Sequence, residues 1–251
     1  MYDFFKTLVF IPLVRWLFRA SITGTEHLPA SGGALVASNH LAAGDAYVLP
    51  AMLSRKLTFP AKAELFRGDR GLGSKVVAWF MKAIKMVPLD RSGGRASLDG
   101  LAPVLNVLRE GGLVGIYPEG TRSPDGRLYK GHSGVARMAV AANVPVIPVA
   151  MFNTQTIRPL GIPWISRPRS VIGAPRDFSA YAGAHDDHAV LRWITDEVMA
   201  AIQELSGQTY VDAYGSSVKR GTLSPAEADA RILPRPGYGA TPPPPAVSGL
   251  S

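Results

Sequence analysis

The chain has 251 residues, of which 47% are hydrophobic, so it is long enough and apolar enough to bury a substantial core. Its 27 Lys and Arg residues outnumber its 19 Asp and Glu residues, and the net charge of +8 favours an anionic partner: nucleic acid, an acidic membrane surface or a phosphorylated substrate. The absence of cysteine excludes disulfides, thiolate metal sites and cysteine nucleophiles.

Residues 1–20, MYDFFKTLVFIPLVRWLFRA, form the most apolar stretch of the chain. Lys6 and Arg15 interrupt it, and the uncharged run from Thr7 to Val14 is far shorter than the roughly 20 residues that a membrane-spanning helix needs. The mixture of aromatic and basic residues, with Pro12 as a kink, favours a helix that lies in the membrane interface. A helix that packs on the protein core is the alternative, because periodicity does not separate the two.

Farther along, apolar runs typical of buried strands alternate with helical patterns, which predicts an α/β fold with a mostly parallel central sheet flanked by helices. The expected strands are residues 34–38, 57–61, 86–89, 113–117, 144–151 and 170–173. The expected helices are residues 46–53, 72–84, 98–108, 134–142 and 189–205. Pro145 and Pro148 interrupt one of these strands and predict an edge position or an irregular path for it.

The pattern dissolves after about residue 214. The stretch PRPGYGATPPPPAVSGLS is too rich in Pro and Gly to form many backbone hydrogen bonds or to bury much surface. The chain is therefore divided into a membrane-interface helix over residues 1–20, one folded domain over residues 21–214 and a disordered tail over residues 215–251.

His40 and Asp45 frame the segment that follows the first expected strand. On a continuous helix, side chains five residues apart point about 140° away from each other, so the pair can meet only across a turn. Gly44 permits an unusual backbone conformation there, and Asp45 can open the next helix with its carboxylate reaching back to the ring. The alternative is that Asp45 merely caps that helix.

Four segments in order, NHLAAGD (39–45), VPLDR (87–91), YPEGTRS (117–123) and VPVIPVA (144–150), resemble the motifs of the glycerophospholipid acyltransferases, most closely the bacterial 1-acyl-sn-glycerol-3-phosphate acyltransferases. The resemblance extends through FPAKAEL, LYKGHSG and LSGQTYVD, and it covers roughly residues 22–214. One departure is Tyr117, where the family usually has phenylalanine.

The resemblance implies a glycerol-3-phosphate acyltransferase-like fold and a catalytic role for His40 and Asp45. Free imidazole, with a pKa near 6.5, suits a general base that takes a proton from an alcohol at neutral pH. Asp45 would hold the ring in the correct tautomer and stabilise the imidazolium as it forms. The acceptor hydroxyl would attack the donor directly, so neither a protein nucleophile, nor a metal, nor a cofactor is expected beyond acyl-CoA or acyl carrier protein as the donor substrate.

An acceptor phosphate calls for cations, and the resemblance points to Arg91 and Arg122, with Lys62 as a third candidate. A lone Arg or Lys is more often a solvated surface charge, which remains the alternative for each. Three further residues of the YPEGTRS motif are expected to bind substrate: Glu119, Gly120 and Thr121. Glu119 would orient Arg122 or the acceptor, and Gly120 would allow close approach of the backbone.

The expected function is the transfer of a fatty acyl group to 1-acyl-sn-glycerol-3-phosphate, forming phosphatidic acid for phospholipid biosynthesis. The expected place is the cytoplasmic face of the cell membrane, where a peripheral or monotopic enzyme would contact anionic lipid. One alternative keeps the chemistry and changes the acceptor to glycerol-3-phosphate, another lysophospholipid or a glycolipid. Another is a non-catalytic lipid-binding protein. Nucleic acid is not an expected partner, because the basic residues are dispersed and no aromatic-basic stacking motif is found.

Overall fold

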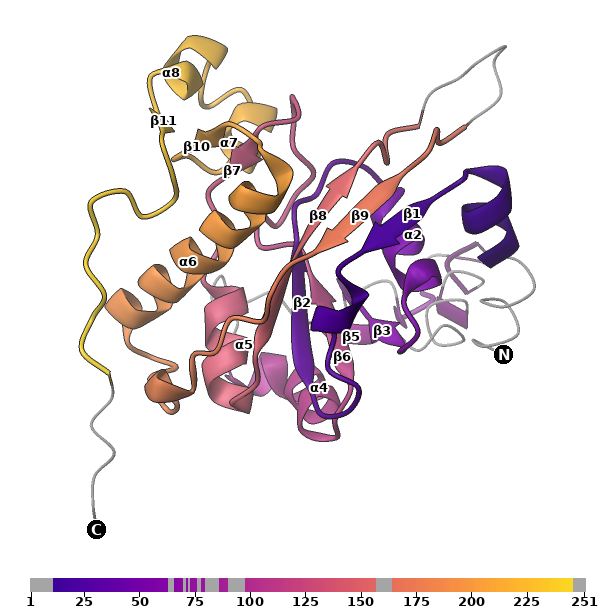
Figure 1. Cartoon of the computed structure of the whole chain (residues 1–251), viewed down its shortest axis with the longest axis horizontal. Helices are drawn as coiled ribbons and strands as arrows, with labels where there is room; N and C mark the ends of the chain where they lie inside the picture. The colour runs from indigo at the N-terminus through magenta and orange to yellow at the C-terminus, as the bar shows by residue number, and fades with distance from the viewer. Residues whose placement is uncertain are drawn as a thin grey trace.

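The computed structural model describes residues 11–62, 66–69, 71, 73–75, 78–79, 86–89, 98–156 and 164–245. A six-stranded sheet forms the centre of the fold (Figure 1). Its strands, in spatial order, are β1 (Ser21–Thr23), β9 (Arg169–Ile172), β8 (Val146–Phe152), β2 (Ala34–Ser38), β6 (Leu113–Ile116) and β3 (Leu57–Thr58). All neighbours are parallel except β8 and β9. The predicted α/β class with a mostly parallel sheet is confirmed.

Helices cover both faces of the sheet, and the side chains of β2 point alternately to the two faces. Leu35 and Ala37 join a core cluster with three helices on one face, whereas Ala34 and Val36 join a second cluster on the other face. The helices of the first face are α4 (Leu98–Arg109), α5 (Gly134–Ala142) and α6 (His188–Ser206), and the second face is covered by α2 (Asp45–Met52) and the short helical turn η2 (Leu13–Leu17) (Figure 1). A strand buried on both sides reads as a continuous apolar run, as ALVAS does.

The prediction of an edge position for the proline-containing strand is wrong, because β8 lies inside the sheet between β2 and β9. The neighbouring strand β9 is nevertheless interrupted where the proline of β8 cannot donate a hydrogen bond. Val149 pairs with Ile172, and the pairing resumes only at Val146, which exchanges backbone hydrogen bonds with Arg176. Pro148 falls between these two points and accepts a bond from the backbone N–H of Gly173. The sheet therefore accommodates the proline at an interruption of β9.

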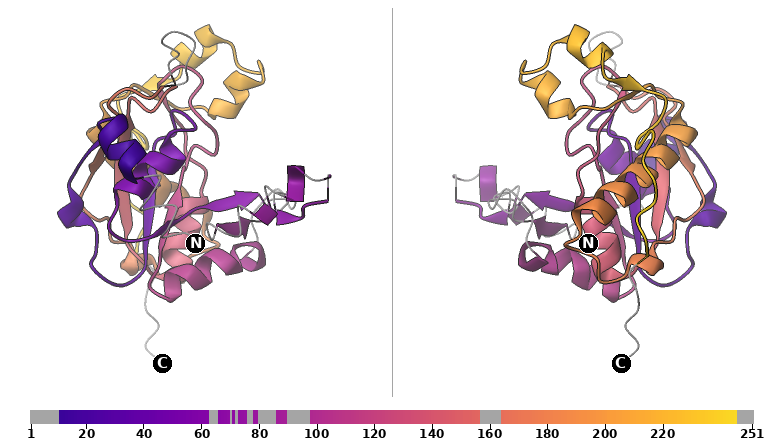
Figure 2. Two further views of the ribbon diagram at one scale, coloured as in Figure 1. Left: turned by 90° about the vertical axis from the view of Figure 1, so that its right-hand side faces the viewer. Right: turned by 90° about the vertical axis from the view of Figure 1, so that its left-hand side faces the viewer.

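A second pair of parallel strands, β4 (Pro60–Lys62) and β5 (Val87–Leu89), extends sideways from the six-stranded sheet (Figure 2). The expected strand over residues 57–61 is thus divided between β3 and β4. Two short 3₁₀ turns, η3 (Thr25–His27) and η6 (Ser179–Tyr181), connect elements elsewhere. Residues 73–75 and 78–79 are helical, as expected for part of the helix over residues 72–84, and the rest of that helix lies outside the described residues.

The disordered tail predicted from residue 215 onward is wrong for the described residues. Strands β7 (Leu128–Tyr129), β10 (Tyr210–Val211) and β11 (Ile232–Leu233) form a small sheet with the helices α7 (Gly215–Lys219) and α8 (Pro225–Asp229) beside it (Figure 1). We call residues 210–233 the C-terminal cap. Its core contains Tyr129 together with four residues of the cap: Val211, Ala213, Leu223 and Ala228. These apolar residues are too widely spaced to form a periodic pattern, and they become a core only against β7.

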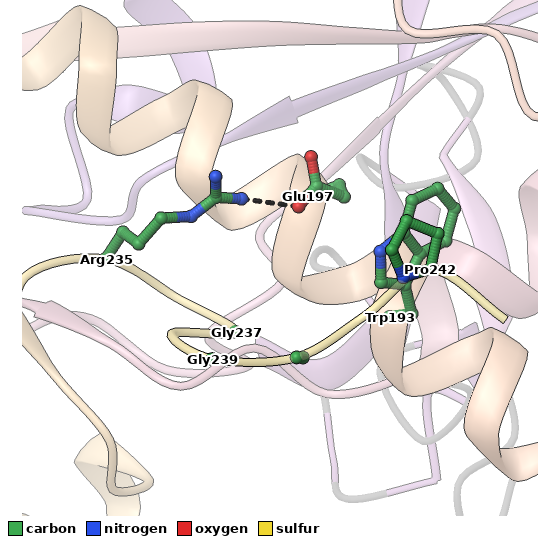
Figure 3. A pocket seen from close by; sticks show the side chains of 7 residues that line it. Trp193, Glu197, Arg235, Gly237, Gly239 and Pro242 are labelled. Atoms are coloured by element: carbon green, nitrogen blue, oxygen red, sulfur yellow. Dashed lines mark hydrogen bonds and ion pairs between the residues drawn. The ribbon is translucent and has the colours of Figure 1, made fainter.

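Beyond the cap, residues 234–245, which we call the strap, run along α6 despite their high Pro and Gly content (Figure 1). Arg235 forms an ion pair with Glu197, and the hydroxyl of Tyr181 donates a hydrogen bond of 3.0 Å to the carbonyl of Pro243. Figure 3 shows the pocket that this strap encloses against α6, with Trp193 in its wall. Side chains of α6 and η6 therefore hold this segment in place. Residues 246–251 lie outside the described part.

At the other end, residues 1–10 of the predicted membrane-interface helix lie outside the described residues. In η2, Val14 is fully buried in the second core cluster, as the core-packing alternative expects. Trp16, two residues on, is 81% exposed, and Leu17 is exposed too. Over the described part of the chain, no helix combines the length and apolarity needed to cross a bilayer.

Candidate active site

The candidate site lies at the carboxyl edge of the main sheet, where ligand sites of α/β folds are common. Strands β2, β6 and β8 run parallel, so the segments that follow them leave from the same edge. His40 follows β2, and the loop of residues 117–123 follows β6. The backbone N–H of Ser123 donates to the carbonyl of His40 over 2.6 Å, which ties the two segments together.

The structure brings His40 and Asp45 together as expected. Nδ1 of the ring lies 2.8 Å from Oδ2 of the carboxylate, which also accepts the backbone N–H groups of Leu41 (2.7 Å) and Ala42 (3.0 Å). Asp45 is the first residue of α2 and its side chain points back along the chain, so it does not act as the helix cap. Because a carboxylate accepts at Nδ1, the hydrogen sits on Nδ1 and the lone pair sits on Nε2.

Gly44 is required for a different reason than expected. Its backbone is ordinary right-handed helix, with φ −56° and ψ −32°, so no unusual conformation is needed. A Cβ atom at this position would lie 2.4 Å from the carbonyl oxygen of Thr154 and 2.9 Å from Cδ1 of Ile165. The glycine therefore lets the start of α2 approach the segment after β8, and this approach sets the position of Asp45.

An aromatic stack fixes one face of the His40 ring. The ring of Tyr117 lies parallel to it at 3.9 Å between centroids, and Phe59 stacks on Tyr117 at 5.3 Å. The hydroxyl of Tyr117 is buried and has no hydrogen-bond partner among the described residues. Burial, followed by the charge of Asp45, raises the pKa of Tyr117 well above its ordinary value. The imidazole is thus held by the carboxylate at its edge and by the stack at its face, while its side chain remains 17% exposed.

Glu119 was expected to orient Arg122 or the acceptor, but in the structure both of its carboxylate oxygens bind backbone N–H groups. Its Oε1 accepts the N–H of His40 over 3.0 Å, and its Oε2 accepts the N–H of Tyr129 over 3.1 Å. The side chain is only 1% exposed, and burial raises the pKa of Glu119 to about 8 against the opposing effect of these two hydrogen bonds. Glu119 therefore links the end of β2 to β7 and positions the backbone of His40.

The three residues that follow Glu119 in this loop are partly or fully exposed. Gly120 has φ +69°, a conformation that favours glycine, and a Cβ there would lie 2.9 Å from Cδ2 of His132. The hydroxyl of Thr121 accepts a hydrogen bond of 3.0 Å from Nζ of Lys219 in α7. Arg122 is exposed, and within the described residues it forms no ion pair. The loop thus presents a cation next to the His40 segment.

The remaining predicted cations are only partly located. The backbone of Lys62 ends β4 opposite Leu89 of β5, and its side chain lies outside the described part. Arg91 comes two residues after Leu89 and is also outside it. Their binding of substrate stays a prediction. No group of three or more His, Asp or Glu side chains suited to a metal ion occurs among the described residues.

Asn39 is a site residue whose role the sequence did not indicate. It is 1% exposed, and its amide accepts the N–H of Met151 over 2.7 Å and donates to the carbonyl of the same residue over 3.1 Å. It also donates to Oε1 of Gln208 over 2.8 Å. A buried amide must satisfy its hydrogen bonds, so Asn39 has to have partners in the folded chain. The one sign of its role in the sequence is its position directly before His40. Asn39 clamps the ends of β2 and β8 together.

Comparison with known proteins identifies relatives of the described core. The family model described as Acyltransferase matches residues 19–152. The 1-acyl-sn-glycerol-3-phosphate acyltransferase of Bacillus subtilis is 35% identical over 122 residues, which are 48% of this chain and 57% of that protein. The chloroplastic enzyme BAT2 of Brassica napus, which bears the same activity in its name, is 34% identical over 145 residues, or 57% of this chain and 40% of that protein. The chain thus covers less than two thirds of either relative.

A solved structure shares the fold. The crystal structure of the 1-acyl-sn-glycerophosphate acyltransferase PlsC from Thermotoga maritima matches with a TM-score of 0.57 and 24% identity, covering 78% of this chain and 76% of that one. His40, Asp45 and the loop of residues 117–123 all lie inside the family match, whereas Gln208 and Lys219 lie beyond it.

Proposed function

The chain belongs to the acyltransferase family, and from this premise we propose that it transfers a fatty acyl group from an acyl thioester to the free hydroxyl of 1-acyl-sn-glycerol-3-phosphate, forming phosphatidic acid. The relatives in Bacillus subtilis and Brassica napus bear this activity in their names. The observation that carries the proposal is the 2.8 Å contact between His40 Nδ1 and Asp45 Oδ2, which leaves Nε2 able to accept a proton.

In the proposed reaction, Nε2 of His40 takes the proton of the acceptor hydroxyl as its oxygen attacks the thioester carbonyl carbon. Asp45 stabilises the imidazolium that forms. The tetrahedral intermediate then collapses, the bond from carbon to sulfur breaks, and the imidazolium returns its proton to the thiolate of the donor. General base catalysis of this kind contributes about 10²- to 10⁴-fold, so the orientation of both substrates supplies much of the remaining acceleration.

The acceptor phosphate is proposed to bind at Arg122, because guanidinium can donate two parallel hydrogen bonds to phosphate oxygens. Arg122 follows β6 in the loop whose Ser123 contacts the carbonyl of His40. Binding there places the headgroup beside the base. The donor is acyl-CoA or acyl carrier protein, and no other cofactor takes part.

The proposed place of action is the cytoplasmic face of the membrane, with the protein held peripherally at the bilayer surface. The net charge of +8 favours anionic lipid, since each basic residue near such a surface contributes about 1 kcal/mol. The exposed side chains of Trp16 and Leu17 offer an apolar contact for the bilayer interface.

The test supplies the purified full chain with a mixture of acyl-CoA and acyl carrier protein donors. The acceptors are 1-acyl-sn-glycerol-3-phosphate, glycerol-3-phosphate, lysophosphatidylcholine and monoacylglycerol. Mass spectrometry of the products is expected to show phosphatidic acid as the main species. Acylation of another acceptor instead of 1-acyl-sn-glycerol-3-phosphate would support the acyl-transfer chemistry and reject the proposed acceptor. The absence of any acylated product would reject both the chemistry and the acceptor.

A further inference from the structure

The C-terminal cap is docked on the loop that carries Arg122. The ring of Tyr214 stacks on His132 at 4.4 Å between centroids, and the N–H of His132 donates to the carbonyl of Pro118 over 2.8 Å. At the start of α7, a Cβ on Gly215 would lie 3.4 Å from Tyr129 and 3.6 Å from the methyl group of Thr121. A segment almost 100 residues away in the chain therefore packs directly against the loop at residues 118–122.

Lys219, at the end of α7, reaches into this contact. Its ammonium donates a hydrogen bond of 3.0 Å to the hydroxyl of Thr121, whose neighbour is Arg122. Burial, and next the charge of Arg122, lower the pKa of Lys219, while Glu119 opposes them. Among the described residues, neither cation forms an ion pair with a carboxylate, although Lys219 is hydrogen-bonded to the residue directly before Arg122.

Two neighbouring cations without a paired carboxylate repel each other, and a doubly charged anion bound between them offsets that repulsion. We propose that Lys219 and Arg122 together bind the phosphate of the acceptor, so that the C-terminal cap adds a cation from outside the family match to the cation that the loop of residues 117–123 supplies. This inference rests on the proposed function for the identity of the acceptor. The role of Thr121 is to hold Lys219 in place, which accounts for a hydroxyl at that position.

The experiment compares Lys219→Gln with Arg220→Gln. Arg220 is the next residue, it is also exposed, and its loss changes the net charge of the cap by the same amount. Loss of one charged hydrogen bond to phosphate is expected to raise the KM for 1-acyl-sn-glycerol-3-phosphate at least about tenfold in Lys219→Gln with little change in kcat. Arg220→Gln is expected to change the KM less than about twofold, and Lys219→Arg is expected to restore most of the affinity.

A binding measurement separates this inference from the proposed function. Isothermal titration of each variant with glycerol-3-phosphate is expected to show the same order of affinities without any turnover. A wild type that binds this phosphate through Lys219 but does not acylate the lysolipid would reject the function and keep the site. A wild type that acylates the lysolipid, with equal KM values for Lys219→Gln and Arg220→Gln, would overturn the inference. Matching thermal unfolding curves exclude loss of folding as the cause.

Discussion

At the scale of single residues, the ring and the hydroxyl of Tyr117 are expected to have opposite effects. Its ring stacks on His40, but its hydroxyl is buried without a partner among the described residues, and an unpaired buried polar group costs about 1–3 kcal/mol. Tyr117→Phe should therefore raise the free energy of unfolding in urea by about 1 kcal/mol and leave kcat within about twofold. Tyr117→Leu removes the stack and should lower kcat about tenfold or more. Equal activity of the two variants would show that the stack does not position the imidazole.

The raised pKa of Glu119 should make the stability of the folded protein depend on pH. Burial raises its pKa to about 8 in the folded state, from a value near 4.5 in the unfolded chain. Between these two values the folded state holds a proton that the unfolded state releases, so the stability that Glu119 contributes is full below pH 4.5 and is lost as the pH rises through about 8.

The comparison uses Glu119→Gln, which cannot ionise. The free energy of unfolding of the wild type minus that of the variant should fall with rising pH by up to about 1.4 kcal/mol per pH unit. Urea unfolding at about pH 5, 6.5 and 8 measures it. A difference that stays constant or grows with pH would mean that Glu119 is ionised in the folded protein throughout this range.

At the scale of secondary structure elements, the start of α2 depends on the absence of a side chain at residue 44. Gly44→Ala would place a methyl group 2.4 Å from the carbonyl oxygen of Thr154, so α2 or its neighbour must shift. We expect a loss of about 1–3 kcal/mol in stability, together with a fall in kcat as Asp45 moves from His40. Gly134→Ala is the control, because Gly134 is also a helical residue and has open space around it. If both alanine variants kept full activity, the close approach at Gly44 would not set the site.

The elements that could be predicted are those whose signal is local. Strand β2 and helix α5 match their expected bounds, since a continuous apolar run and an amphipathic pattern can be read from neighbouring residues. The strands β7 and β10 have two residues each and no readable alternation, and they form because they pair with each other, and β10 also with β11. The same is true of the side chains. The turn between His40 and Asp45 was predictable, whereas Glu119 bonds a backbone 79 residues away, and its partner could not be known.

At the scale of the whole molecule, the C-terminal cap is another structure that depends on contacts between distant parts of the chain and could not be predicted from the sequence. Composition predicted disorder, because Pro and Gly disfavour regular secondary structure. The cap nevertheless pairs with β7, and the strap after it contacts α6 and η6. Lys219 bonds to Thr121 across 98 residues, so only the folded chain reveals that it lies beside Arg122.

Membrane contact is also a property of the whole molecule, and exposed Trp16 provides its test. Trp16→Ser should reduce partitioning onto vesicles that contain anionic lipid about tenfold, because insertion of a large apolar side chain contributes about 1.5–3 kcal/mol. Tyr238→Ser, which also removes an exposed aromatic ring but from the strap, is the control. Vesicle flotation measures both. Equal binding of the two variants would place the membrane contact elsewhere.

The central claim is that the imidazole of His40 removes the proton of the acceptor hydroxyl, and the rate of acyl transfer by His40→Ala tests it most directly. The matched control is His185→Ala, since His185 also lies beside an aspartate, Asp186, at the surface. We expect a loss of at least about 10²-fold in kcat for His40→Ala, with normal folding and vesicle binding, and no loss for His185→Ala. A His40→Ala protein that forms phosphatidic acid at the wild-type rate would show that His40 is not the base.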